Sequence, residues 1–149
     1  MLKTTIRIQA KPFDLAQEVE VLSCGDAGAV ATFTGSVRAE EGLTALVLEH
    51  YPGMTEREIA HQVEDAGRRW PLFAVTVIHR VGELKPGESI VLVAVAASHR
   101  GDAFAACEFL MDHLKTKAPF WKEERRGADT RWVEAKVSDD EALGRWQRR

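Results

Sequence analysis

The chain has few cysteines, and they are not spaced for a metal site or a disulfide framework. Its 149 residues contain two, Cys24 and Cys107, whereas zinc-binding sequences place cysteines and histidines in close pairs. Cys107 falls on the apolar side of a predicted helix, where a small buried hydrophobic residue is the expected role. We therefore predict a reduced, cytoplasmic setting, and neither a bound metal nor another cofactor.

A basic surplus is also missing. The formal net charge is -3 at pH 7, from 20 Lys and Arg against 23 Asp and Glu. Proteins that hold nucleic acids mainly by neutralising phosphates usually carry an excess of basic residues. The net charge argues against a nucleic-acid partner, but a local anion site is compatible with it.

Long apolar runs and glycine-rich nucleotide loops are absent as well. No run approaches the roughly 18 residues of a membrane span, and residues 1–10 alternate polar and apolar side chains instead of forming a signal peptide. No GxGxxG or P-loop motif occurs, which weakens a nucleotide-binding alternative. We expect a soluble, unprocessed protein that does not contact a membrane.

The apolar content is sufficient for one core. Hydrophobic residues make up 45% of the sequence, and this length fits one domain, 1–149. Residues 138–149 are charged, with Leu143 and Trp146 spaced for one helical turn, and they form a possible docking tail.

Strand and helix signals mix along the chain. Helix caps are predicted at Asp14, at Thr55 with Glu58, and at Asp102. Turn signals predict that neighbouring strands pair as hairpins. A hairpin is also the simplest interpretation of the polar loop 39–42. Apolar patterns predict strands at residues 4–9, 29–33, 43–51, 75–81, 89–97, 120–124 and 131–136. The strand at 29–33 is expected to be buried. We predict the α+β class, with a mixed, largely antiparallel sheet, hairpins and flanking helices.

The most unusual polar chemistry lies in residues 98–124, SHRGDAFAACEFLMDHLKTKAPFWKEE. An apolar strand leads into His99 and Arg100. A helix follows, with Phe104, Cys107, Leu110, Met111 and Leu114 expected on its apolar side. Pro119 must end that helix, so Lys115 lies in its last turn and Lys122 just past the break. Lysines near a helix C-terminus often only complement its dipole. Combined with His99 and Arg100, they indicate a local anion pocket.

Further candidates lie earlier in the chain. Arg38 lies in the segment 34–38 that follows the strand at 29–33, and this segment contains Gly35, a glycine that either relieves a bulge or lets the backbone come close to another group. Arginines make bidentate contacts to phosphate, and a lysine crowded by other cations can lose its proton. No serine or cysteine is convincingly paired with a base, so hydrolysis is not expected. His79 and Arg80 lie within a strand, where a structural role is the default.

These motifs, with VIHRVGELKPGE, LEHYPGMTE and RWVEA elsewhere in the chain, closely resemble the catalytic (large) subunit of molybdopterin synthase. The resemblance runs from about Gly28 to Glu134. It implies a fold of the α/β hammerhead type. It also implies catalysis by Lys115 and Lys122, and substrate contacts from Ser36, Val37, Arg38, His99, Arg100, Lys115, Lys122, Glu123 and Glu124. The chain departs from the family in loop 39–42, where Glu40 and Glu41 are expected to point to solvent.

The resemblance further implies a function. The family is a sulfurtransferase that converts cyclic pyranopterin monophosphate into molybdopterin, in molybdenum cofactor biosynthesis. Two sulfurs become the product's dithiolene. They are donated by the C-terminal thiocarboxylate of a small ubiquitin-like subunit, whose Gly-Gly tail enters the pocket. A homodimer of large subunits then gives a heterotetramer, and we expect the strand at 89–97 and Trp146 to help the dimer contacts.

Two other classes stay open. A binding module that senses a phosphorylated metabolite needs the arginines but not the lysine pair. A structural scaffold needs neither.

Overall fold

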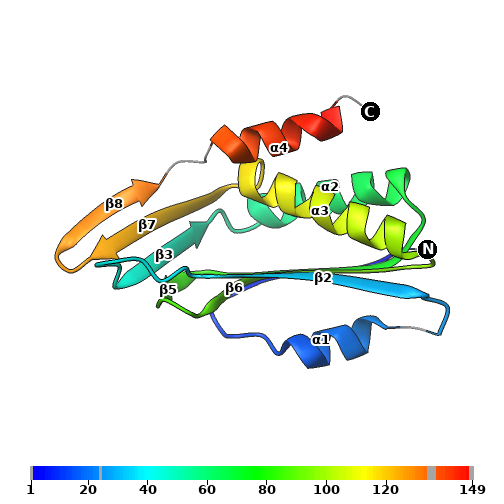
Figure 1. Ribbon diagram of the computed structural model, residues 1–149, viewed down its shortest axis with the longest axis horizontal. Helices are drawn as coiled ribbons and strands as arrows, with labels where there is room; N and C mark the ends of the chain where they lie inside the picture. The colour runs from blue at the N-terminus through cyan, green and yellow to red at the C-terminus, as the bar shows by residue number, and fades with distance from the viewer. Residues whose placement is uncertain (1, 24, 134–136, 148–149) are drawn as a thin grey trace.

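The computed structural model describes residues 2–23, 25–133 and 137–147. Within them the order is β1(Lys3–Gln9), α1(Leu15–Leu22), β2(Ala29–Ser36), β3(Ala45–His50), α2(Met54–Arg69), β4(Leu72–Arg80), β5(Gly82–Leu84), β6(Ser89–Ala97), α3(Arg100–Thr116), β7(Phe120–Arg126), β8(Asp129–Val133) and α4(Val137–Gln147). Figure 1 shows these elements in layers. The mixed arrangement confirms the predicted α+β class.

The first sheet has the strand order β1-β4-β6-β2. β6 lies between β4 and β2 and is antiparallel to both, whereas β1 runs parallel to β4. Side chains of β6 alternate between the two faces of the sheet. Val91, Val93 and Val95 join one core cluster, while Leu92, Ala94 and Ala96 join another. The apolar run is therefore buried on both faces, and the expectation that it helps dimer contacts is wrong.

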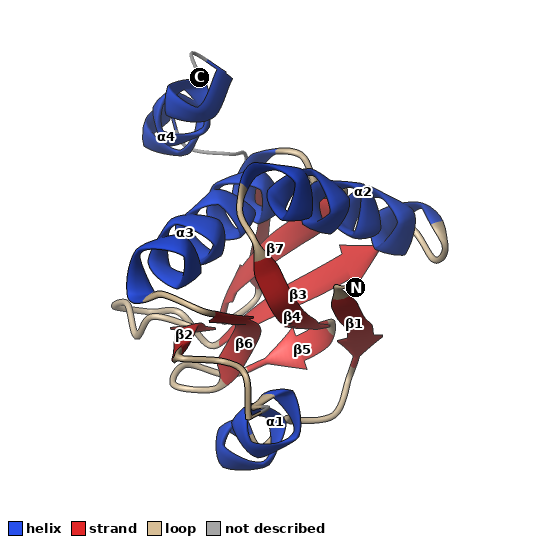
Figure 2. Ribbon diagram, turned by 90° about the vertical axis from the view of Figure 1, so that its right-hand side faces the viewer, coloured by secondary structure: helices blue, strands red, loops and turns tan. Residues whose placement is uncertain are grey.

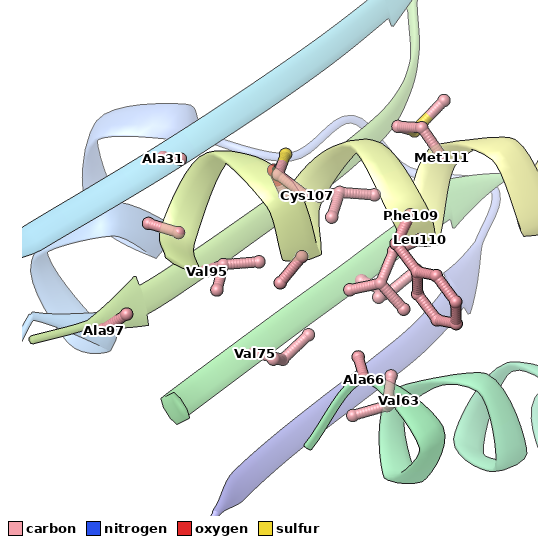
Figure 3. Close-up of a cluster of buried hydrophobic side chains, with 14 of the residues drawn as sticks. Ala31, Val63, Ala66, Val75, Val95, Ala97, Cys107, Phe109, Leu110 and Met111 are labelled. Carbon is pink, nitrogen blue, oxygen red and sulfur yellow. Dashed lines mark hydrogen bonds between the residues drawn. The ribbon is translucent and has the colours of Figure 1, made fainter. Parts of the chain in front are cut away.

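Helices cover both faces of this sheet. α2 and α3 lie on one side and α1 on the other (Figure 2). The larger core cluster joins α2 and α3 to the sheet through side chains such as Val63, Phe109 and Leu110 (Figure 3). The smaller cluster contains Leu22 of α1. Asp14 caps α1 as predicted, because its carboxylate accepts a hydrogen bond from the N–H of Gln17 at 3.2 Å.

A second sheet, of order β5-β3-β7-β8, extends from one end of the first (Figure 1). Its own small core contains Val37, Leu48 and Leu84. The predicted hairpin at Gly127 is confirmed, since β7 and β8 pair antiparallel on either side of it. The part of the predicted strand at 134–136 lies outside the described residues.

Two strand predictions near residue 40 are wrong. Residues 29–33 form an edge strand with Ala31 as its buried residue, not a buried strand. The proposed hairpin across loop 39–42 does not form, because β2 pairs with β6 while β3 pairs with β5 and β7 in the other sheet. The loop therefore crosses from one sheet to the other.

Two helix starts also differ from the prediction. α2 begins after Gly53, whose N–H is bound by the side chain of Glu56 at 2.9 Å, so the capping box is not at Thr55. α3 begins at Arg100, with His99 rather than Asp102 at its N-cap. Phe104, expected on the apolar side of α3, is 66% exposed.

The C-terminal helix α4 packs on α3. Trp146 is buried, and its indole N–H donates to the carboxylate of Asp112 at 2.6 Å. Arg145 bonds to Glu108 at 2.7 Å. Trp146 thus contributes to the chain's own core and does not help dimer contacts, contrary to expectation. Among the described residues, no helix is long and apolar enough to cross a membrane.

Candidate functional site

A cavity of about 140 Å³ lies where the end of α3 meets both sheets. Its apolar lining comes mainly from β2, β6 and α3, and its polar groups come from four different elements. The lining residues are Phe33, Gly35, Ser36, His79, Ile90, Val91, Met111, Leu114, Lys115, Ala118, Phe120 and Lys122.

The two candidate lysines reach this cavity from different elements. Lys115 lies in the last turn of α3, one turn after Met111, which also lines the cavity. The helix ends at Thr116, just before Pro119, and β7 then carries Lys122 back past the same cavity. The chain reversal at Pro119 thus brings the two ammonium groups to one pocket.

Ser36 enters the pocket at an irregular strand end. The register between β2 and β6 shifts between Gly35 and Ser36, so Gly35 does mark a bulge. Gly35 also lines the pocket, where an added Cβ would lie 2.9 Å from Cγ1 of Val91. The bulge interpretation of this glycine is therefore supported, and an approach of its backbone to a ligand stays a prediction.

The structure turns Val37 away from the cavity. Its side chain is buried beside Leu48 and Leu84. Its N–H donates to the carbonyl of Glu88 at 2.9 Å, and its carbonyl accepts from the N–H of Gly87 at 2.8 Å. Arg38, the next residue, is exposed and makes no ion pair with any described residue.

The carboxylates of Glu123 and Glu124 are occupied by arginines. Glu123 accepts from Nε of Arg125 at 3.1 Å. Glu124 accepts from Arg126 at 3.2 Å and lies 3.9 Å from a guanidinium nitrogen of Arg131. Neither glutamate lines the cavity that contains the lysines.

Loop 39–42 is tied to β7 by Arg126. The guanidinium donates to the carboxylate of Glu40 at 2.8 Å and to the carbonyl of Glu41 at 2.6 Å. The hydrogen bond to Glu40 raises the pKa of Arg126. Glu40 is exposed, as expected, but its charge is paired rather than simply solvated.

His99 and Arg100 lie at the opposite end of α3 from Lys115. Fifteen residues separate Arg100 from Lys115 in one continuous helix, which corresponds to roughly 22 Å along its axis. Both His99 and Arg100 are exposed. Within one chain, these two residues therefore do not share the lysine pocket.

The structure adds His79 to the residues of the cavity, although the sequence predicts only a structural role for it. Its ring lines the cavity and stacks on Phe120, with ring centroids 3.8 Å apart. Burial, together with the charges of Lys122 and His50, lowers the pKa of His79 to about 4, against a partial opposing effect of its hydrogen bond to Arg80. The ring is therefore neutral at physiological pH.

No cysteine or metal cluster serves this cavity within the described part of the chain. Cys107 is buried on α3 outside the cavity, and burial raises the pKa of its thiol to about 11. Cys24 lies outside the described residues. The described residues contain no group of three His, Cys, Asp or Glu side chains that could hold a metal ion.

Comparisons with known proteins give one family. Residues 8–117 match the family model described as MoaE protein. A molybdopterin synthase catalytic subunit from Ralstonia nicotianae is 54% identical over 147 residues, which is 95% of this chain and 84% of that protein. The structure of a molybdopterin biosynthesis MoaE protein from Burkholderia ambifaria superposes with a TM-score of 0.85 at 53% identity, covering 97% of this chain and 98% of the other.

A third similarity is more distant and bears on the fold alone. It is to a chain in a complex of subunits 1 and 2 of molybdopterin-converting factor from Helicobacter pylori. The TM-score is 0.73 at 20% identity, covering 91% of each chain. From the family match and the two closer relatives, this chain belongs to the MoaE protein family.

Proposed function

We propose that this chain is the large, catalytic subunit of a molybdopterin synthase. It acts as a sulfurtransferase that converts cyclic pyranopterin monophosphate into molybdopterin, in molybdenum cofactor biosynthesis. The name of the Ralstonia relative supports this assignment. A reduced, cytoplasmic setting stays a prediction.

One observation carries the proposal from the side of the structure. Lys115 and Lys122 line one small, mostly apolar cavity from two separate elements. Among the described residues, this cavity is lined by no cysteine thiol. It suits a reaction in which a second protein brings the sulfur.

The lysine pair can supply acid–base and electrostatic chemistry. One amine of the pair, in its neutral form, can attack a carbonyl or accept a proton, while its charged neighbour stabilises the oxyanion that forms when the thiocarboxylate or a pterin intermediate is attacked. Either lysine can take either of these two roles.

The phosphate of the substrate needs cationic groups that are not already paired. Arg38 lies two residues after Ser36, which lines the cavity, and makes no ion pair with a described residue. Guanidinium groups bind phosphate through two parallel hydrogen bonds. We assign the phosphate contact first to Arg38. Ser36 supplies a hydroxyl, and Val37 shapes the loop from the core.

A second copy of the chain supplies His99 and Arg100 in this proposal. They lie too far along α3 to reach the lysine pocket of their own chain. Val30, Phe33 and Phe104 are exposed apolar side chains on β2 and α3, and Phe33 and Phe104 line one shallow groove. A homodimer formed over this surface would cover apolar area and bring cations toward a neighbouring pocket.

The sulfur donor is a small ubiquitin-like subunit with a thiocarboxylated Gly-Gly tail. The Helicobacter complex, whose two proteins are subunits of one converting factor, is consistent with such a pairing. With two large subunits at the centre, the assembly is a heterotetramer. Glu123 and Glu124 stay predicted contacts, although their carboxylates are engaged by arginines in the free chain.

A turnover assay separates this function from the alternatives. The purified chain is incubated with the pterin precursor and a thiocarboxylated small subunit, and formation of the dithiolene product is measured. Product that depends on the chain is expected. A sensor module would bind the precursor without forming product, and a scaffold would neither bind nor convert it.

A further inference from the structure

His79 joins the two sheets at the wall of the lysine pocket. It lies on β4 in the first sheet and is 7% exposed. Its imidazole stacks on Phe120 of β7, in the second sheet, at 3.8 Å and an interplanar angle of 19°. Phe120 and Lys122 are two residues apart on β7 and so project to the same face. The stack therefore fixes the strand segment that presents Lys122.

The hydrogen bonding of His79 defines which ring nitrogen carries the proton. Nδ1 lies 2.8 Å from the carbonyl oxygen of Arg80. A carbonyl can only accept, so Nδ1 carries the hydrogen and the neutral ring has its lone pair on Nε2. The lowered pKa keeps the ring in this form at neutral pH.

The lone pair of Nε2 is open to the cavity. Nε2 makes no hydrogen bond to a described residue. Among the described residues, every side-chain nitrogen or oxygen that is fully buried has a hydrogen-bond partner. Nε2 must therefore be accessible from the cavity that His79 lines. The other polar side chains of this cavity are Ser36, Lys115 and Lys122. Because ammonium groups only donate, the neutral imidazole gives the pocket a fixed acceptor.

We propose that His79 is a positioning residue for the lysine pair: its stack on Phe120 holds the β7 segment that carries Lys122, and its neutral ring presents a hydrogen-bond acceptor, Nε2, to the cavity that Lys122 also lines. This inference rests on the proposed function for its kinetic consequence but not for its geometry. A protonated His79 would instead repel Lys122, so the neutral form is the one that the role requires.

Paired substitutions separate the acceptor from the stack. His79→Phe keeps an aromatic ring against Phe120 but removes Nε2. His79→Gln loses the ring but can place an amide oxygen near the Nε2 position. We expect His79→Phe to lower the single-turnover rate of sulfur transfer roughly tenfold to a hundredfold, the scale for a misplaced reacting group. Precursor affinity and melting temperature should stay near those of the wild type, and His79→Gln should recover part of the rate.

A spectroscopic arm tests the geometry without any turnover. In the full chain labelled with ¹⁵N-histidine, the His79 signals are assigned by their loss in His79→Phe. Lys122→Ala should shift the Nε2 resonance of His79, whereas Lys117→Ala, at the exposed end of α3, should leave it unchanged. An Nε2 resonance that ignores Lys122→Ala would overturn the proposal. So would a wild-type transfer rate in His79→Phe. If the wild-type chain shows no synthase activity, the proposed function fails while the spectra still decide the role of His79.

Discussion

At the scale of single residues, the buried neutral ring of His79 makes the stability of the fold depend on pH. Its pKa is about 4 in the folded chain, against an ordinary 6.5. Between these pH values, His79 binds a proton in the unfolded chain but not in the folded chain. The contribution of the neutral ring to the free energy of unfolding is therefore complete above pH 6.5 and is lost as the pH falls toward 4. Between pH 7.5 and 4.5 the free energy of unfolding should fall by about 2–3 kcal/mol from this group.

Urea denaturation at both pH values measures this effect. His79→Phe should lose less free energy of unfolding than the wild type on acidification. His61→Ala serves as the control, because His61 is exposed on α2. An equal loss in the wild type and in His79→Phe would show that other groups cause the pH dependence.

Cys107 should be nearly inert toward alkylation. Burial raises the pKa of its thiol to about 11, so only about one molecule in a thousand carries the reactive thiolate at pH 8. In a Cys24→Ala variant, which leaves Cys107 as the one thiol, iodoacetamide should label the folded chain far more slowly than the urea-unfolded chain. Equal rates in both states would contradict the burial of this side chain.

The candidate site could be predicted in part from the sequence. Pro119 fixes the end of α3, and that places Lys115 and Lys122 on either side of the break. His79 could not be found in the same way, because it lies inside a strand and its role comes from a stack with Phe120 of another sheet. Contacts across 41 positions of sequence leave no local pattern.

At the scale of elements, Thr55 connects the start of α2 to the chain entering β7. Its buried hydroxyl accepts from the N–H of Tyr51 at 3.0 Å and donates to the carbonyl of Pro119 at 3.0 Å. Thr55→Val should lower the free energy of unfolding by about 1–3 kcal/mol, since two part-buried hydrogen bonds to the backbone are lost. Thr55→Ser keeps the hydroxyl and should be closer to the wild type.

Denaturant midpoints of the two Thr55 variants give the comparison. Equal stability of Thr55→Val and the wild type would mean that this bridge does not stabilise the chain entering β7.

Helices and central strands were predictable because their apolar periodicity and end signals are local. The partners of β2 and β3 were not. A hairpin is the default for two strands joined by a short polar loop, yet here each strand belongs to a different sheet. That choice depends on which strands complete each sheet, and residues 39–42 carry no information on it. Phe104 was misplaced for a related reason, because an exposed apolar side chain and a buried one look alike in a periodic pattern.

At the scale of the whole molecule, the proposed homodimer predicts complementation between two inactive variants. Lys115→Ala and Arg100→Ala each damage a different half of a site shared between two copies. In a mixed dimer, one pocket combines the intact Lys115 of one chain with the intact Arg100 of the other. Mixing the two variants under conditions of subunit exchange should therefore restore activity, to about a quarter of the wild type if the chains mix at random and each intact pocket works alone.

Two observations would contradict the shared site. One is a mixture no more active than its components. The other is a monomer mass by light scattering at micromolar concentration.

Lys115, in the pocket between the two sheets, takes part in sulfur transfer in the proposed reaction. Single-turnover transfer is measured with saturating precursor and saturating thiocarboxylated small subunit, for the wild type, Lys115→Ala and Lys117→Ala. Lys117 is a matched control, because it follows α3 directly but does not line the pocket. We predict a loss of about a hundredfold or more in Lys115→Ala, the typical contribution of an acid–base group, and a wild-type rate in Lys117→Ala. A full rate in Lys115→Ala at saturation would show that Lys115 takes no part in the chemistry and only clamps the partner's anionic tail.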